Sequence, residues 1–398
     1  MSKPKVEFKV GFIYTGGTIG SIEKKNKRTE LIQSAEELLD LLFAKDYKSP
    51  SEVLSIPHSD ILSHPKGKPI NYTISYRDII RSYDIIPMSS PFIKFSEDVN
   101  IEDLKNLTKE IAELLTKECF SGIIVAHGTD NIIPNAQYTR FSFTGYLPMP
   151  IFFIGESRPL ENSSLHGALN TMDEISDYMS KVTGRTSCNY NDVYIVDFTS
   201  SVLIQEASDT YFISHEKGLN SLNGYLDTIG IGQSARSFLD FKRKNDQVLN
   251  FKPEFRFEEK FDQRVKTYKV SMFSDPSEIE YYTKKGYKGL IIEALGSGNG
   301  PDSMTPYISD FIKAGGIVAV TSQSPGEKVE PVYGTANKWD KLGVIFTGRT
   351  LTSAAHIKLG KALAYTNDYA KIYRVMTSNC FGENPGAYWI NNFSWSSL

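Results

Sequence analysis

The chain has 398 residues, of which 40% are hydrophobic and 23% charged, as in a globular protein with two or three domains. Its formal net charge of −3 offers no basic surface, so neither nucleic acid nor an anionic membrane is expected as a partner. The apolar runs are strand-sized and the N-terminus lacks the apolar core of a signal peptide, so we expect a cytoplasmic protein.

The first stretch with a clear pattern is an apolar run, Val10 to Tyr14, which predicts a buried strand. It ends in the turn Thr15-Gly16-Gly17-Thr18, whose adjacent glycines allow positive φ and let a ligand approach the backbone N–H groups. A hydroxyl at the carboxyl end of a strand faces the crevice where open α/β sheets bind ligands. Thr15 is therefore a candidate nucleophile, although the same residues also fit an ordinary glycine turn with a capping threonine.

Helices and strands alternate through the first part of the chain. A capping box at Ser34 predicts one helix, and regular apolar spacing predicts another from Ile101 to Glu118. Residues 45–75 are expected to be mostly loop. Further strands are expected at 84–88, 122–126, 150–154 and 192–198, and further helices at 135–146 and 164–179. This alternation predicts a mostly parallel sheet covered by helices on both faces.

A charged and aromatic stretch without clean periodicity, residues 240–266, is expected to link two domains. The α/β pattern restarts with strands expected at 265–273, 289–294 and 316–321, and helices at 276–285, 304–314 and 352–365. The fold class is therefore α/β. We expect a larger N-terminal domain over residues 1–239 and a smaller C-terminal domain over residues 267–398.

Hydroxyl-bearing turns follow neighbouring strands of the predicted N-terminal sheet. His127-Gly128-Thr129-Asp130 leaves the strand at 122–126, and Ser96-Glu97 follows the strand at 84–88. Together with the Thr15 turn they would meet in one crevice. Two threonines, a serine and a carboxylate suit nucleophilic acyl transfer, with backbone N–H groups stabilising the oxyanion. No metal or other cofactor is expected, because the histidines have no i, i+4 pair and the cysteines are widely spaced.

The stretch Tyr14 to Gly20, combined with His127 to Asp130, resembles the bacterial-type L-asparaginase family, particularly its cytoplasmic type I branch. The D component of the archaeal glutamyl-tRNA amidotransferase belongs to the same superfamily. The resemblance covers nearly the whole chain and includes the segments Met88–Asp98, Gly296–Pro301 and Ser322–Ser324. It implies a two-domain asparaginase-like fold, hydrolysis of a small-molecule amide through an acyl-enzyme, and assembly as a homodimer or homotetramer with sites between subunits.

The resemblance also implies a role for each residue of the crevice. Thr15 would be the nucleophile and Thr129 the second catalytic threonine. Asp130 would bind the α-amino group of the substrate, Ser96 its α-carboxylate, and Glu97 would line the same pocket. Two structural alternatives stay open: Ser96 and Glu97 could start the following helix, and Thr129 and Asp130 could cap one.

Two positions depart from the family pattern. Tyr211 stands near the column of the family's catalytic lysine, and the nearest basic residues are His215 and Lys217. A tyrosine with an ordinary pKa of about 10 is a poor base at neutral pH. Arg349 and Ser353 stand near an Asp and a Glu of the family, of which the Glu binds the substrate amino group in a neighbouring subunit. A cation there should weaken ammonium recognition by about 1–3 kcal/mol.

These features leave three functions open. The first is an amidohydrolase of the asparaginase type, acting on asparagine or on a derivatised or peptide-borne amide. The second is a catalytically silent relative that binds a small ligand or a protein partner, since the lysine and the Glu are missing. The third, a component of a tRNA-dependent amidotransferase, is disfavoured because the sequence shows no basic patch or added N-terminal domain. If Arg349 reaches a neighbour's pocket, the preferred substrate should carry an extra negative charge or lack the free ammonium.

Overall fold

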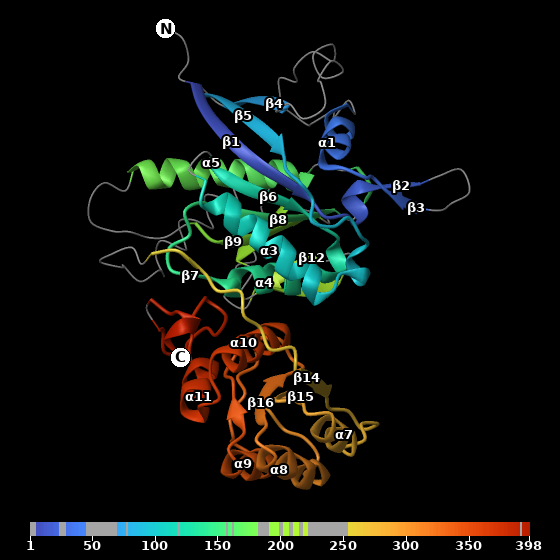
Figure 1. The fold of residues 1–398 in the computed structure, drawn as a ribbon, viewed down its shortest axis with the longest axis vertical. Coiled ribbons are helices and arrows are strands. Elements are labelled where there is room, and N and C mark those ends of the chain that lie inside the picture. The colour runs from blue at the N-terminus through green and yellow to red at the C-terminus, as the bar shows by residue number, and fades with distance from the viewer. Residues whose placement is uncertain are drawn as a thin grey trace.

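A computed structural model of the chain describes residues 5–23, 29–44, 70–76, 79–117, 120–156, 158–160, 163–181, 191–198, 202–206, 210–214, 218–221, 254–390 and 392–398. Figure 1 shows two α/β units stacked along the long axis of the molecule, the N-terminal unit in blue to green and the C-terminal unit in yellow to red. None of the helices in these ranges is both long and apolar enough to span a membrane.

The N-terminal unit is built on a seven-stranded sheet in the order β10-β9-β8-β6-β1-β5-β4. The inner strands are parallel, and β4 and β10 run antiparallel at the two edges, so the predicted mostly parallel sheet is confirmed. The strands are β1 (Lys5–Tyr14), β4 (Ile70–Tyr76), β5 (Ile79–Pro87), β6 (Gly122–Ala126), β8 (Ile151–Glu156), β9 (Val193–Phe198) and β10 (Val202–Glu206).

Several elements of this unit have other bounds than predicted: β1 begins at Lys5 rather than Val10, and β5 begins at Ile79 rather than residue 84. Residues 70–75, at the end of the stretch expected to be mostly loop, belong to β4, whose sequence alternates apolar and polar residues. The helix expected at 135–146 is α4, which begins at Ile132 and ends at Ser142. It ends there because the chain enters the short strand β7 (Phe143–Thr144), which pairs with β13 (Arg256–Phe257). Residues 45–69 of the expected loop lie outside the described part of the chain.

Alternate side chains of the strands enter two cores, one on each face of the sheet. Phe12 and Tyr14 of β1 point to the face covered by α1 and α5, whereas Ile13 points to the face covered by α3 and α4. This alternation follows from the two-residue period of a strand. The helices are α1 (Ala35–Ala44), α3 (Ile101–Leu115), α4 (Ile132–Ser142) and α5 (Ser163–Lys181).

The C-terminal unit has a four-stranded parallel sheet in the order β14-β15-β16-β17, with α10 and α11 on one face and α7, α8 and α9 on the other. Three of its elements, α9, β17 and α11, are short and were not predicted. β14 stops at Lys269 rather than residue 273 because the chain turns at Ser271–Ser274. The elements are β14 (Val265–Lys269), α7 (Glu278–Lys284), β15 (Gly289–Ala294), α8 (Thr305–Lys313), β16 (Ile317–Ser322), α9 (Gly334–Lys341), β17 (Ile345–Phe346), α10 (Thr352–Tyr365) and α11 (Tyr369–Thr377).

The linker predicted at 240–266 is only partly described, because residues 222–253 lie outside the described ranges. The described residues 254–264 run from β13 into β14. Two further antiparallel strand pairs lie among the described residues. They are β2 (Ser21–Glu23) with β3 (Thr29–Leu31), and β11 (Thr210–Ser214) with β12 (Gly218–Ser221). The domain limits at residues 239 and 267 stay predictions.

Helix α4 belongs to both units. Ile132, Ile133 and Ala136 in its first half pack in the core of the N-terminal unit. Tyr138 and Phe141 in its second half pack with α10 in a core of the C-terminal unit. A helix that is buried around most of its circumference lies between two packed layers. The two units are therefore joined through a shared helix rather than through a surface contact alone.

Two lysines of α10 are fully buried near this junction. The Lys358 ammonium pairs with the Glu383 carboxylate and donates to the Ser378 carbonyl at 2.7 Å. The Lys361 ammonium donates to the backbone carbonyl of Glu258 at 2.7 Å and lies 4.9 Å from the centre of the Tyr138 ring. Burial lowers the pKa of Lys361 to about 7. The Lys358 ammonium is thus paired with a carboxylate, whereas the Lys361 ammonium is bonded to a neutral carbonyl and lies near an aromatic ring.

We expect these two lysines to respond differently to replacement by methionine. Lys358→Met leaves the Glu383 carboxylate buried without its cation, which should lower the free energy of unfolding by about 3–5 kcal/mol. Lys361→Met removes a poorly compensated buried charge and should be neutral or stabilising at pH 7. Urea unfolding of both variants at pH 7 measures the difference, and equal destabilisation would contradict it.

The pH dependence of the wild-type protein gives a second readout for Lys361. Its pKa in the folded state, about 7, is below the ordinary value of 10.5, so the unfolded chain binds more protons between these pH values. This lysine should therefore make stability rise with pH from about 7 to 10.5. The free energy of unfolding of Lys361→Met should therefore increase less between pH 7 and pH 9 than that of the wild type.

Candidate active site

Three turns meet at the carboxyl ends of the adjacent strands β5, β1 and β6. Gly16 forms a parallel bridge with Lys94, whose N–H donates to the Thr15 carbonyl at 3.0 Å. A Cβ atom added to Gly17 would lie 2.1 Å from the Cα of Gly128. One added to Gly128 would lie 2.7 Å from the Cβ of Ser96. The structure thus brings the three predicted turns into direct contact, and glycine at each position is what allows it.

Thr15 follows β1 directly, precedes the two glycines and is 2% exposed. Its backbone N–H and its hydroxyl both donate to the carbonyl of Ala126 in β6, at 2.9 and 3.0 Å. Gly16 and Gly17 follow with φ of 105° and 86°, values that favour glycine. Attack on a substrate would require the hydroxyl to exchange this bond for one to a proton acceptor, because a carbonyl does not take the proton.

Tyr14 supports the turn from within the N-terminal core. Its hydroxyl donates to the carbonyl of Gly20 at 3.1 Å and so closes the loop that begins at Thr15. Burial, and secondarily the charge of Glu37, raises the pKa of Tyr14 above its ordinary value. The phenol therefore stays protonated and acts as a hydrogen-bond donor.

Ser96 and Asp130 face each other across the second and third turns. The buried Ser96 hydroxyl donates to Oδ2 of the exposed Asp130 at 3.1 Å, and the Asn131 side chain donates to the Ser96 carbonyl at 2.7 Å. Thr129 is half-buried beside them, and Glu97 is exposed. This arrangement leaves an accessible carboxylate next to a buried hydroxyl where the second and third turns meet.

The two helix-capping alternatives were wrong. The cap of α3 is Asn100, which accepts from the N–H groups of Glu102 and Asp103. Ser96 and Glu97 belong instead to a separate 3-10 turn, η2 (Ser96–Asp98). Neither α4 nor the turn before it, η3 (Thr129–Asn131), has a side-chain cap.

His127 holds the third turn against α4. Its Nδ1 lies 2.8 Å from the Gly128 carbonyl, and its Nε2 lies 2.7 Å from the side-chain nitrogen of Asn135. A carbonyl only accepts, so Nδ1 carries the proton and Nε2 accepts from Asn135. Burial lowers the pKa of His127 to about 4, against the bond to Gly128, which raises it. The imidazole is therefore a neutral positioning group with both nitrogens engaged.

This buried histidine should make the protein less stable in mild acid. Its pKa falls from 6.5 to about 4 on folding, so between these values the unfolded chain takes a proton that the folded chain refuses. Because of this histidine, the free energy of unfolding should fall by about 3 kcal/mol as the pH is lowered from 6.5 to 4. In urea unfolding, the free energy of unfolding of His127→Gln should fall less from pH 7 to pH 5 than that of the wild type.

A matched variant separates this histidine from the half-buried His356. Burial likewise lowers the pKa of His356 to about 4, and His356 bonds Thr267 within the C-terminal unit. His356→Gln should also flatten the decline, but it should leave the Thr129 turn unchanged. A His127→Gln profile as steep as that of the wild type would contradict the assignment.

The side chains named for the predicted proton relay lie outside the described part of the chain. Tyr211 belongs to β11, which contacts α4, but its side chain lies outside the described part. His215 and Lys217 also lie outside the described ranges. Lys94, whose backbone pairs with Gly16, binds both carboxylate oxygens of Asp103 at 2.7 and 2.9 Å. Its ammonium is thus directed at the start of α3.

Arg349 lies on the C-terminal unit between β17 and α10. Its N–H donates to the Asn384 side-chain oxygen at 3.0 Å, and its guanidinium donates to the carbonyl of Gly326. These contacts hold an exposed cation within the C-terminal unit, and neither hydrogen bond is to the Thr15 turn. Ser353 lies in the first turn of α10. Among the described residues no cluster of His, Cys, Asp and Glu suits a metal ion.

Comparison with known proteins identifies both parts of the chain. A family model described as "Asparaginase, N-terminal" matches residues 9–188, and one described as "Glutaminase/Asparaginase C-terminal domain" matches residues 264–376. The D component of the glutamyl-tRNA(Gln) amidotransferase of Methanosarcina acetivorans is 26% identical over 383 residues, covering 94% of this chain and 78% of that protein. Its counterpart in Thermococcus kodakarensis is 28% identical over 297 residues, covering 72% of this chain and 64% of that protein, less than two thirds of its length.

Three solved structures with the same fold are described as asparaginases. The thermostable L-asparaginase from Thermococcus kodakarensis has a TM-score of 0.69 at 17% identity and covers 95% of this chain and 100% of its own. The L-asparaginase I from Vibrio cholerae has a TM-score of 0.65 at 19% identity, and the match covers 95% of this chain and 99% of that one. A probable cytoplasmic L-asparaginase from Campylobacter jejuni has a TM-score of 0.61 at 17% identity, and the match covers 93% of this chain and 99% of that one. The predicted two-domain α/β architecture is confirmed.

Proposed function

The chain belongs to the asparaginase family, and from that premise we propose that it hydrolyses a side-chain amide, of asparagine or a related compound, to a carboxylate and ammonia. The observation that carries this proposal is the contact of the Thr15, Ser96 and Thr129–Asp130 turns at one sheet edge. This contact supports the proposal because a hydroxyl, glycine N–H groups and a serine–aspartate pair lie together at that edge.

In the proposed reaction the Thr15 oxygen forms a bond to the amide carbon and gives up its proton. The amide nitrogen takes a proton and leaves as ammonia, so an ester to Thr15 remains. Water then adds to the ester carbon, the carboxylate product leaves, and the proton returns to the threonine oxygen. Backbone N–H groups of the glycine turn would stabilise the oxyanion in both steps. Thr129 is proposed as the second catalytic threonine.

Substrate binding is assigned to the other side of the crevice. The exposed Asp130 carboxylate would attract an α-amino group, and the Ser96 hydroxyl would donate to an α-carboxylate after leaving Asp130. Glu97, exposed on η2, would line the same pocket. The proton acceptor is assigned to the region of β11 and β12 that carries Tyr211 and Lys217, since His127 is neutral and fully bonded.

We further propose a cytoplasmic homodimer or homotetramer in which Arg349 faces the crevice of a neighbouring copy. Loops at the carboxyl edge of the C-terminal sheet expose large apolar side chains, and exposed apolar surface of this kind marks protein interfaces. These residues are Met272, Phe273, Leu295, Val332 and Tyr333. A guanidinium at this position favours a substrate with an additional carboxylate, or one whose α-amino group is blocked.

A second candidate function is the hydrolytic component of an amidotransferase. The observation in its favour is that a relative named as the D component of a glutamyl-tRNA(Gln) amidotransferase matches over 94% of this chain. The two functions share the chemistry at Thr15 and differ in what happens to the ammonia. Turnover by the isolated chain favours the free amidohydrolase, whereas turnover that requires a partner protein and tRNA favours the amidotransferase. Ligand binding without turnover in either setting supports a silent relative.

The test is ammonia release by the purified chain from three kinds of amide. Free asparagine and glutamine form the first, α-amino-blocked asparagine the second, and an asparaginyl amide with a second carboxylate the third. We expect release from at least one kind, with the second and third preferred over the first. A folded protein that releases no ammonia from any of them would overturn the proposed function.

A further inference from the structure

The chain continues beyond the asparaginase C-terminal domain, whose family model ends at residue 376. The described residues after α11 contain one 3-10 turn, η6 (Trp395–Ser397), and no α-helix or strand. Figure 1 shows this segment, in red, between α11 and the N-terminal unit. A segment that lacks regular structure must satisfy its backbone groups by other contacts. We name residues 378–398 the C-terminal segment.

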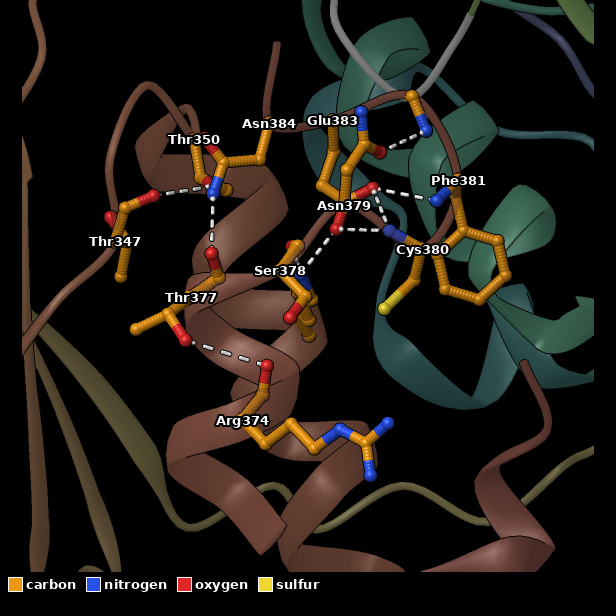
Figure 2. Close-up of polar contacts among 12 residues, drawn as sticks. Thr347, Thr350, Arg374, Thr377, Ser378, Asn379, Cys380, Phe381, Glu383 and Asn384 are labelled. Atoms are coloured by element: carbon orange, nitrogen blue, oxygen red, sulfur yellow. Dashed lines mark hydrogen bonds and ion pairs between the residues drawn. The ribbon is translucent and has the colours of Figure 1, made fainter. Parts of the chain in front are cut away.

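The start of the C-terminal segment is fixed by a buried carboxylate. Glu383 accepts from the N–H groups of Cys380, at 3.2 Å, and Phe381, at 2.7 Å, and it pairs with Lys358 of α10. Figure 2 shows the carboxylate facing these two N–H groups and Asn384 bonded to the Thr377 carbonyl at the end of α11. This end of the segment is therefore part of the C-terminal unit.

The other end of the C-terminal segment reaches the last turn of α4. The indole N–H of Trp395 donates to the carbonyl of Phe141 at 2.6 Å. The ring of Phe141 stacks on Phe381 with ring centres 4.9 Å apart, and Trp395 and Phe393 pack around Phe381. The last four carbonyls of a helix have no partner within it. Trp395 supplies one of those partners from outside the N-terminal unit.

A second buried carboxylate holds Trp395 in place. Glu258 accepts from the N–H groups of Trp395, at 2.9 Å, and Ser396, at 2.6 Å, and from the hydroxyls of Ser394, at 3.0 Å, and Thr144, at 2.7 Å. The Glu258 N–H donates to the Ser142 carbonyl at 2.8 Å. Trp395 is fully buried as a result. The end of α4 is thus capped by two groups that belong to the linker and the C-terminal segment.

The opposite end of α4 carries the candidate site. η3, with Thr129 and Asp130, leads directly into α4, and Asn135 in its first two turns bonds His127 at 2.7 Å. The helix is short and buried along most of its length, and a close-packed interior transmits displacement, so we expect a change in position at Phe141 to reach its start. A contact at one end of α4 therefore influences the turn at the other.

We propose that Trp395 is a positioning residue for the Thr129–Asp130 turn and acts through α4. The C-terminal segment couples the placement of α4 to the C-terminal unit, so the crevice keeps its shape only while the Trp395–Phe141 bond is made. The structural part of this inference is independent of the reaction. Its catalytic consequence rests on the proposed function.

The test compares Trp395→Phe with a matched control, Trp339→Phe. Both replacements keep a buried aromatic ring and remove one indole N–H bond, to Phe141 in the first case and to Thr305 at 3.1 Å in the second. Amide hydrogen exchange of residues 127–137 is measured in both variants, with ammonia release measured in parallel. We expect exchange in this stretch to become at least about fivefold faster in Trp395→Phe and to stay within about twofold of wild type in Trp339→Phe.

The activity readout is expected to follow the exchange readout. Trp395→Phe should raise KM and lower kcat, because Asp130 is a proposed binding residue and Thr129 a proposed catalytic one, and Trp339→Phe should change neither. Unchanged exchange at 127–137 in Trp395→Phe, or an equal change in both variants, overturns the inference whatever the activity is. Faster exchange in Trp395→Phe alone supports it even where no substrate is turned over, which separates it from the proposed function.

A second variant keeps the inference testable if Trp395→Phe does not fold. Glu258→Gln retains the size of the side chain but replaces a carboxylate that accepts four bonds by an amide with one acceptor oxygen. It should loosen Trp395 and speed exchange at 127–137 by a similar factor. A Glu258→Gln protein with wild-type exchange in that stretch would overturn the inference.

Discussion

Replacing Thr15 by alanine is expected to lower kcat for amide hydrolysis by about 10³-fold or more, because the attacking oxygen is lost. The fold should persist, since the Thr15 N–H still donates to the Ala126 carbonyl at 2.9 Å. Ammonia release and urea unfolding measure the two effects. The variant therefore shows whether the Thr15 hydroxyl is needed for the reaction in a protein that keeps its fold.

Two control variants make this result specific. Thr15→Ser keeps a hydroxyl at the same place and should retain part of the activity, whereas Thr18→Ala removes the other threonine of the turn and should retain most of it. If Thr15→Ala kept more than a tenth of the wild-type kcat, the nucleophile would have to be another group of the crevice.

Replacing Gly16 by alanine should lower the free energy of unfolding by more than about 3 kcal/mol and abolish activity. The added Cβ would lie 1.9 Å from the Lys94 carbonyl oxygen at a φ of 105°, so both the contact and the backbone conformation are unfavourable. The overlapping atom belongs to the backbone that also bonds Thr15, so relief of the overlap would separate the first two turns. Urea unfolding measures the loss.

Gly286→Ala is the matched control for this substitution. Gly286 has a φ of 75° and no atom within 4 Å of an added Cβ, so it carries the backbone cost alone. That cost is about 1–2 kcal/mol. Equal destabilisation of the two variants would show that the close approach of Gly16 to Lys94 adds nothing.

The strand-end turns could be predicted from the sequence because their chemistry is local. Thr15, Gly16 and Gly17 follow an apolar run directly, and Gly128 and Thr129 follow another one after His127. Parallel strands then place their carboxyl ends at one edge without further information. The order β5-β1-β6 supplies what the pattern could not, namely which turns are neighbours.

The contacts that hold the turns in place have no local signal. The bond from Asn135 to His127 and the ion pair between Lys94 and Asp103 link different elements. An amide or a charged residue on a helix usually faces solvent, so its type alone does not indicate a buried partner. Conserved pairs in related sequences could reveal such contacts, whereas one sequence cannot.

The largest gap between sequence and structure concerns buried charge. Lys358, Lys361, Glu258 and Glu383 are all buried, although lysine and glutamate are almost always found at the surface. Their burial follows from α4 being shared by two units and from the C-terminal segment closing over the junction. These are tertiary features, and they override the preferences of the individual residues.

The central claim is that Thr15 carries the acyl group during turnover. Rapid acid quenching during hydrolysis of the best amide, followed by peptide mass spectrometry, tests it directly. The claim predicts that the peptide with Thr15 gains the mass of the acyl group, that the gain appears before steady state, and that Thr15→Ala lacks it. Turnover with no modified Thr15 peptide, or with the acyl group on Thr129, would contradict the claim.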